Sequence, residues 1–228
     1  SRSAQVQLSK VILMHRKFGA FGKIPALGDF LRIDLSPGFI QPWDKWLQAS
    51  IIGVKETLGG RWAETYMSTP IWRFTLPQGV AGPHAMSGIL MASVDSLGRQ
   101  YPLTLAAPHG CQSTAQIHFA NRTTFEHLED IALWALDDDF KRDMLATALE
   151  NGRILEPEIN LDLNLPYSGP VPAAQSLAAQ AIIQSHGKTP SLWSTAMEGD
   201  HRLMACQGLP KTKDIHALFD ISSPAWNT

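Results

Sequence analysis

Residues 86–106 read MSGILMASVDSLGRQYPLTLA, and this stretch decides the fold class. Residues 86–94 are a mostly apolar run suited to a central strand, and residues 101–106 are a second β-rich run. The turn at residues 96–99 is short enough to join the two runs as antiparallel neighbours. Pro102 is expected at the start of the second strand, because proline has no N–H to donate to a ladder. The pattern predicts a pair of antiparallel strands inside a larger sheet.

Further β-rich runs lie on both sides of this pair in the sequence. Residues 18–28 read FGAFGKIPALG and predict a short strand that leads into a loop, because glycine and proline recur every few residues. Residues 71–76 (IWRFTL) predict another strand. Residues 191–196 and 202–206 predict a hairpin near the C-terminus.

Helical periodicity is clearest after the turn at residues 36–38. Apolar residues with a period of 3.6 predict an amphipathic helix that ends at Gly59–Gly60; they occupy positions 39, 40, 43, 46, 47, 51, 54 and 58. Pro42 is expected in the first turn of this helix, where the missing N–H breaks no helical bond. Shorter helices are expected at residues 174–184 and 214–219.

Residues 123–151 predict a second long helical region. Thr123 followed by Glu126 fits a capping box at its start. The acidic triplet at residues 137–139 is expected to break the region into two helices, with one aspartate capping the second.

These elements predict an α/β fold in which a mixed, largely antiparallel sheet is sandwiched by helices. We expect a single domain over residues 18–228, with a larger part at 18–150 and a smaller C-terminal part at 151–228. Residues 1–17 match no folded pattern and are interpreted as a disordered tail or a remnant of cloning.

Composition excludes several classes of protein. The chain has 228 residues, of which 44% are hydrophobic, so it can bury a core. Its 19 Lys+Arg against 21 Asp+Glu leave no broad basic face for nucleic acid. No apolar run reaches the roughly 18–20 residues of a membrane span, so no membrane insertion is expected. The two cysteines, Cys111 and Cys206, cannot form a disulfide framework, which favours a reducing, cytoplasmic setting.

Familiar catalytic and ligand-binding patterns are absent from the sequence. There is no phosphate loop, no HExxH motif and no metal-ligand spacing among the histidines, so no metal, cofactor or catalytic residue is expected. Trp43 and Trp46 have helical spacing and are interpreted as core residues. On a strand, Trp72 shares a face with Phe74 while Arg73 points the other way.

One group of polar residues stands out around the central turn. Ser93 and Asp95 share a strand face, and Asp95 can form a charge-assisted, bidentate pair with Arg99. Lys23 and Asp29 flank the glycine- and proline-rich loop and could join them. The structural interpretation is a salt bridge that fixes the turn, and the functional one is a polar recognition patch at the strand ends.

Several long strings in the chain resemble the family of type VI secretion-associated proteins called TagF or ImpM. The strings are FGAFGKIPALGDFLR (18–32), WDKWL (43–47), YMSTPIWRFTL (66–76), GILMASVDSLGRQYPLTLAA (88–107) and SLWSTA (191–196). The resemblance is strong over residues 18–107 and weaker toward the C-terminus. Ser194 departs from it, because a second aromatic residue is expected there.

The resemblance implies a cytoplasmic accessory protein that holds type VI secretion in check after translation. It implies a forkhead-associated (Fha) scaffold protein as partner and a link to a separate metal-dependent protein phosphatase. The family motif falls on Gly22, Lys23, Pro25, Gly28, Asp29, Phe30, Trp72, Arg73, Ser93, Asp95, Gly98 and Arg99. We treat Lys23, Asp29, Trp72, Arg73, Ser93, Asp95 and Arg99 as candidate partner contacts.

The expected function is therefore that of a non-enzymatic, post-translational repressor that binds a scaffold protein. The alternative is a hydrolase or phosphate-handling enzyme that uses Asp29, Asp95 and Arg99, which would then converge in a partly buried pocket. A third possibility, a structural subunit of the secretion apparatus, predicts a large exposed apolar patch.

Overall fold

The structure of the chain is a computed structural model, and it describes most of the sequence. The described residues are 17–110, 113–137, 139–150, 152–156, 189–197, 200–211 and 213–226. The helix expected at 174–184, the tail at residues 1–16 and Cys111 lie outside them.

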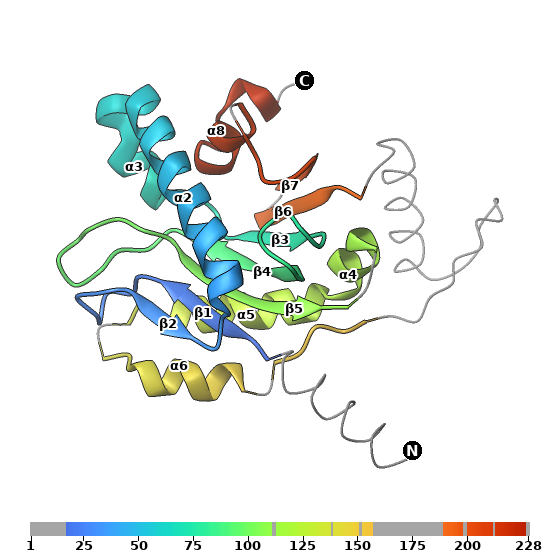
Figure 1. Cartoon of the computed structure of the whole chain (residues 1–228). Coiled ribbons are helices and arrows are strands. Elements are labelled where there is room, and N and C mark those ends of the chain that lie inside the picture. The colour runs from blue at the N-terminus through green and yellow to red at the C-terminus, as the bar shows by residue number, and fades with distance from the viewer. Residues whose placement is uncertain are drawn as a thin grey trace, which may run out of the picture.

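The described residues form one seven-stranded sheet with helices on both faces (Figure 1). The strands are β1 (Gly19–Gly22), β2 (Leu31–Ile33), β3 (Trp72–Leu76), β4 (Ala85–Met91), β5 (Leu103–His109), β6 (Ser191–Met197) and β7 (Asp200–Cys206). Their order in the sheet is β2-β1-β5-β4-β3-β6-β7, and every pairing is antiparallel. The predicted α/β class with a largely antiparallel sheet is confirmed.

The helices are divided between the two faces of the sheet. They are α2 (Pro37–Leu58), α3 (Trp62–Met67), α4 (Thr114–Ala120), α5 (Arg122–Trp134), α6 (Arg142–Leu149) and α8 (Lys213–Phe219), with short 3₁₀ turns at Gly59–Arg61 and Pro224–Trp226. Side chains of α2, α3 and α8 share one core with the sheet, and those of α5 and α6 share the other. α4 contacts β3 and β6.

The central strand pair is confirmed. β4 pairs with β5 from Ala85↔His109 to Met91↔Leu103, and Pro102 lies just before β5, where no ladder bond is lost. The hairpin of β6 and β7 is confirmed as well. β2 was not predicted, because three residues are too few to show an alternating pattern. It is one edge of the sheet, and the carbonyl of its Arg32 accepts a hydrogen bond of 2.9 Å from Arg142 of α6.

Helix α2 begins earlier than the sequence suggested, and this moves Pro42. The helix starts at Pro37, so Pro42 lies in the second turn, and the prediction of the first turn is wrong. A proline at this position cannot bond the carbonyl of Gly38, four residues earlier. Gly82, with φ of +113°, packs against that carbonyl so closely that a Cβ would lie 2.3 Å from its oxygen.

The predicted helix caps in the second helical region are wrong. α5 begins at Arg122, and Glu126 accepts a hydrogen bond from Arg122 instead of closing a capping box. Before it, the Asn121 side chain bonds the carbonyl of Ile117 and both backbone groups of Leu155, so these contacts fix where α5 starts. α6 follows Lys141 with no side-chain cap. The short helices α3 and α4 were not predicted, whereas α8, which is equally short, was expected at residues 214–219.

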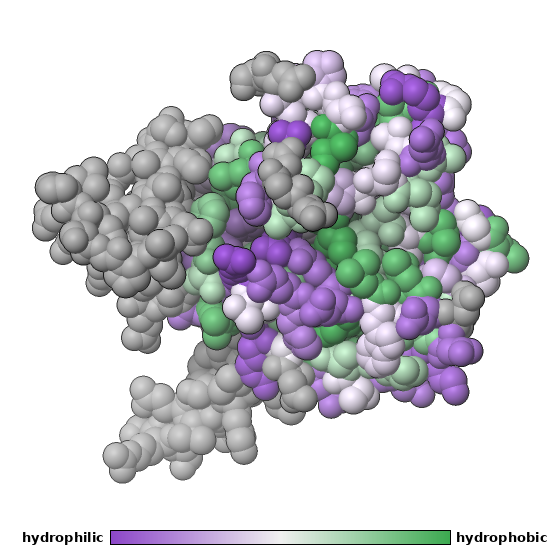
Figure 2. Space-filling model, turned by 180° about the vertical axis from the view of Figure 1, so that it is seen from behind, coloured by the Kyte–Doolittle hydropathy of each residue, from purple (hydrophilic) through white to green (hydrophobic). Residues whose placement is uncertain are grey.

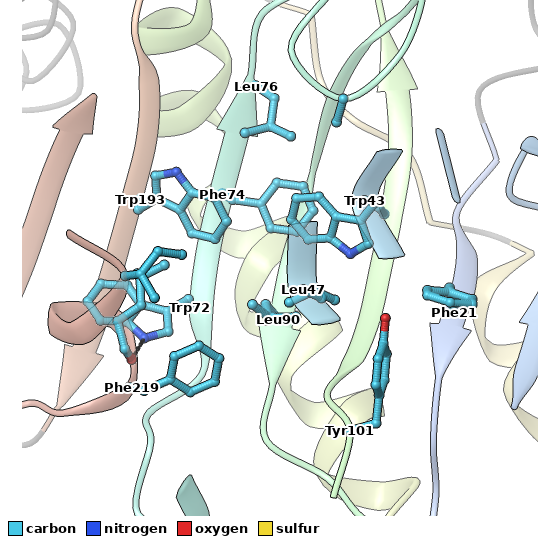
Figure 3. Close-up of a cluster of buried hydrophobic side chains, with 14 of the residues drawn as sticks. Phe21, Trp43, Leu47, Trp72, Phe74, Leu76, Leu90, Tyr101, Trp193 and Phe219 are labelled. Carbon is cyan, nitrogen blue, oxygen red and sulfur yellow. Dashed lines mark hydrogen bonds between the residues drawn. The ribbon is translucent and has the colours of Figure 1, made fainter. Parts of the chain in front are cut away.

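The face of the sheet beneath α2 is covered by aromatic residues (Figure 3). The ring centroid of Trp43 in α2 lies 4.8 Å from that of Phe74 in β3. Trp43 also stacks parallel to Trp193 of β6, with ring centroids 6.1 Å apart. Its indole N–H donates to the Thr104 hydroxyl of β5 over 2.9 Å. The interpretation of Trp43 as a core residue is confirmed, and Trp46 packs beside it, partly buried.

The opposite face is mainly aliphatic. Ile89, Leu103 and Leu105 of the sheet pack there against Leu128 of α5 and Leu145 of α6, all with no exposed surface. The alternation along each strand produces this division, because successive side chains point to opposite faces.

Candidate functional site

The polar residues around the central turn meet at Asp95, which follows β4. Asp95 is only 2% exposed. Its Oδ1 accepts the backbone N–H groups of Leu97 (3.0 Å) and Arg99 (2.9 Å). Its Oδ2 accepts Lys23 Nζ (2.9 Å) and Arg99 Nε (2.7 Å). All of these donors favour the carboxylate form.

The charge of Asp95 is held in place by these partners. Burial alone would raise the pKa of this carboxyl, but the hydrogen bonds from Lys23, Arg99 and Leu97 outweigh it and hold the pKa well below its usual range. Asp95 therefore stays ionised at every pH at which the protein is expected to work, and it pairs two cations at once.

Lys23 and Arg99 connect the turn to the loop between β1 and β2. The Lys23 ammonium is 5.2 Å from the centre of the Phe30 ring in that loop. Arg99 Nη2 donates to the carbonyl of Gly28 over 2.8 Å, and Ser96 N–H donates to the carbonyl of Leu27 over 3.0 Å. The two loops are therefore bonded to each other by both side chains and backbone.

The predicted salt bridge between Asp95 and Arg99 is present but has a different geometry. A bidentate pair was expected, whereas Arg99 gives only Nε to Asp95 and directs Nη2 to Gly28. The reason is that Oδ1 of Asp95 already accepts two backbone N–H groups of the turn.

Asp29 and Ser93 do not join this network. Asp29 is exposed, and its Oδ1 accepts the N–H of the next residue, Phe30, over 2.7 Å. Ser93 is buried; its backbone N–H and carbonyl both bond the Tyr66 hydroxyl. Within the described part of the chain, the Ser93 hydroxyl has no hydrogen-bond partner.

Trp72 and Arg73 lie in the middle of the sheet, in β3. Trp72 is 1% exposed in the aromatic core, and its indole N–H donates to the carbonyl of Leu218 over 2.7 Å. Arg73 points to the other face, as expected, and makes a bidentate pair with Glu129 of α5 at 2.6 and 2.8 Å. The structure therefore gives both residues packing contacts within the fold.

The exposed side chains over the network form what we call the turn surface: Asp29, Phe30, Leu97 and Arg99. Leu97 is 75% exposed at the tip of the turn, and Phe30 is 37% exposed. Phe30 was expected only as a motif position, and Leu97 was not expected to belong to a site. An apolar residue between the two residues of a turn-fixing ion pair was the signal that could have identified it.

The geometry that an enzyme would need at these residues is not present. The enzyme alternative requires Asp29, Asp95 and Arg99 to converge in a pocket. Instead Asp95 and Arg99 pair across the turn, and the Asp29 carboxylate bonds its own neighbour. Among the residues that the structure describes, no three His, Cys, Asp or Glu side chains are grouped so that they could hold a metal ion.

A buried histidine that no sequence pattern singled out links α4 to the sheet. His118 Nδ1 lies 2.9 Å from the Thr75 hydroxyl of β3, and Nε2 lies 2.7 Å from the Ser194 hydroxyl of β6. Complete burial, with a smaller contribution from the Arg73 charge, lowers the pKa of His118 to about 3. A neutral imidazole between two hydroxyls stabilises the contact of α4 with the sheet. One of these hydroxyls belongs to Ser194, the position at which the resemblance led us to expect an aromatic residue.

None of the helices built from described residues combines the length and apolar character that crossing a membrane requires.

Comparisons with known proteins agree with the resemblance seen in the sequence. Residues 19–151 match a family model described as the TagF N-terminal domain, type VI secretion system-associated. The crystal structure of PA0076 from Pseudomonas aeruginosa PAO1 is similar, with a TM-score of 0.71 and 25% sequence identity. That similarity covers 90% of this chain and 94% of the other. A search of curated proteins found no match.

Proposed function

The chain belongs to the TagF family of type VI secretion-associated proteins, and we propose that it represses assembly of that system after translation by binding a scaffold protein. The proposed partner is the forkhead-associated scaffold protein of the system, and the proposed setting is the cytoplasm. A separate metal-dependent protein phosphatase is a second proposed partner.

The observation that carries this proposal is the turn surface and the network beneath it. Asp95 bonds two cations and two backbone N–H groups, so the turn at residues 95–99 and the loop at 23–30 keep one arrangement. A surface that is rigid before binding loses less conformational entropy when a partner binds it. The buried network would thus contribute to affinity without touching the partner.

The exposed groups of the turn surface have the chemistry of a protein contact. Leu97 supplies an apolar side chain that is 75% exposed and can be buried by a partner. Asp29 and Arg99 lie beside it with opposite charges, and 57% of the Arg99 side chain is accessible. An apolar centre with a charged rim is typical of transient protein interfaces.

Repression would follow from occupancy. A scaffold protein held at the turn surface presents less of its own surface to the components that it recruits. The chain would then act in proportion to its amount, as a stoichiometric binder does.

The proposal is tested by measuring binding of the purified Fha scaffold protein to the full chain by biolayer interferometry. We expect Leu97→Ala to weaken binding by about 10-fold, since truncation of an interface anchor costs about 1–2 kcal/mol. Leu155→Ala is the matched control, because Leu155 is 58% exposed and its backbone bonds Asn121, which is not part of the turn surface. Wild-type chain that fails to bind the scaffold, or equal binding by both variants, would contradict the proposal.

A further inference from the structure

A shallow apolar groove lies between the end of α5 and helix α6. It has a volume of about 380 Å³ and is lined by Trp134, Asp143, Met144, Thr147 and Ala148. Most of the lining surface is apolar, so water molecules in the groove form few hydrogen bonds with the protein and are displaced at little cost. We call it the α5–α6 groove.

Three exposed apolar side chains lie at the end of α5, and one of them, Trp134, lines the groove. Leu133 is 52% exposed, Trp134 41% and Leu136 37%, all at or just after the last turn of α5. The Trp134 ring meets the buried Phe140 ring edge to face, with centroids 4.8 Å apart, so its position is fixed. Figure 2 shows the side of the molecule opposite to the view of Figure 1, where hydrophobic residues gather beside strongly hydrophilic ones. Fixed, half-exposed aromatic rings are typical anchors of protein interfaces.

Four aspartates belong to the segments that form this groove, and one of them, Asp143, lines it. Asp130, Asp137, Asp139 and Asp143 are all exposed. Within the described part of the chain, none of the four forms an ion pair. Against these four aspartates stand two exposed cations of the same stretch, Lys141 and Arg142, and Arg142 directs a nitrogen to the carbonyl of Arg32. The rim of the groove therefore carries an excess of negative charge.

We propose that the α5–α6 groove binds an amphipathic helix of a partner protein whose apolar face is flanked by Lys or Arg. The apolar lining fits the apolar face of such a helix, and the four aspartates fit its basic flanks. A second copy of this chain would bring the same aspartates against each other in a symmetric contact, and like charges disfavour that arrangement. An anionic lipid surface is disfavoured for the same reason. This site shares no residue with the turn surface, so either can fail without the other.

The test uses the full chain and a fluorescein-labelled synthetic peptide of 18 residues, built from Leu and Lys in a helical amphipathic pattern. Fluorescence anisotropy measures its affinity, and the same peptide with Glu in place of Lys is the matched probe. We expect the Lys peptide to bind at least about 10-fold more tightly than the Glu peptide and to weaken as salt is raised.

Two pairs of variants locate the binding. Asp137→Lys with Asp143→Lys should weaken binding of the Lys peptide by about 10-fold or more. Glu56→Lys with Glu64→Lys makes the same change of net charge at exposed positions of α2 and α3, and should leave binding within about 2-fold. Met144→Gln should also weaken binding, because it removes apolar surface from the lining of the groove without changing charge. Circular dichroism confirms that each variant is folded.

Three results would overturn the proposal. One is an equal loss of affinity in both charge-reversal pairs, because it would indicate unspecific attraction. A second is a dimer in sedimentation that Met144→Gln dissociates, because the occupant of the groove would then be a second copy. A third is binding of phosphatidylglycerol vesicles that Met144→Gln weakens, because the occupant of the groove would then be a lipid surface.

Discussion

The two faces of the sheet are held to their helices by different chemistry. Under α2, aromatic rings fill the core, and their polar atoms join segments far apart in the sequence. Trp72 donates to the carbonyl of Leu218, and Trp46 donates to that of Pro210, so the N-terminal and C-terminal parts of the chain are bonded through indoles. Under α5, aliphatic side chains fill the core, and the link to the helix is ionic, between Arg73 and Glu129.

The difference shows how two layers of one small protein can respond differently to conditions. An indole has no charge to lose, so the α2 face should respond little to pH. The opposite face contains a neutral buried histidine and an ion pair, and both depend on protonation. Three measurements sharpen or break this comparison.

The largest effect is expected from Trp43→Ala. The substitution removes a fully buried indole from the α2 face and leaves the Thr104 hydroxyl without its donor. The free energy of unfolding should fall by about 3–5 kcal/mol, as measured by urea denaturation. The control is Trp134→Ala, which removes a half-exposed indole from the other side and should cost about 1 kcal/mol or less. Equal losses in the free energy of unfolding would show that the buried Trp43 contributes no more to stability than the half-exposed Trp134.

An intermediate effect is expected from pH, through His118. Its pKa is about 3 in the folded chain and about 6.5 when unfolded. Above pH 6.5 neither state binds the proton, so stability is complete; below it the unfolded state binds one proton more, and stability falls as pH falls. At pH 5 the loss should be about 2 kcal/mol relative to pH 7, by urea denaturation. His118→Gln should remove this part of the pH dependence, and an unchanged dependence would exclude His118 as its cause.

The smallest effect is expected from the pair of Arg73 and Glu129. Their side chains are 12% and 20% exposed, so water screens the pair only in part. A double-mutant cycle with Arg73→Met and Glu129→Gln should give a coupling free energy of about 1–2 kcal/mol. The same cycle on the exposed pair of Arg122 and Glu126 should give no measurable coupling. Coupling as large in the exposed pair would contradict the role of burial.

The sequence predicted elements that have either a marked β-rich or apolar run or a sustained helical period. The strands at 86–94 and 101–106 are of the first kind, and the helix ending at Gly59–Gly60 is of the second. β2 and α3 are too short to show a period, and the start of α5 depends on Asn121 contacts with Leu155, which no local pattern records.

The candidate site was predicted in part for the same reason. The ion pair of Asp95 with Arg99 is local and was expected. Lys23 and Asp95 are 72 residues apart in the sequence, and they meet only because β1 pairs with β5 in the sheet. The role of Lys23 could therefore not be predicted from a local pattern. The position of His118 also follows only from the assembled sheet.

The short edge strand β2 has a consequence for self-association. A foreign strand that added to this side would find only three residues to pair with, one of them the charged Arg32. It would also compete with the Arg142 guanidinium for the Arg32 carbonyl. Templated growth of the sheet into fibrils is therefore discouraged at this border, whatever the concentration of the protein.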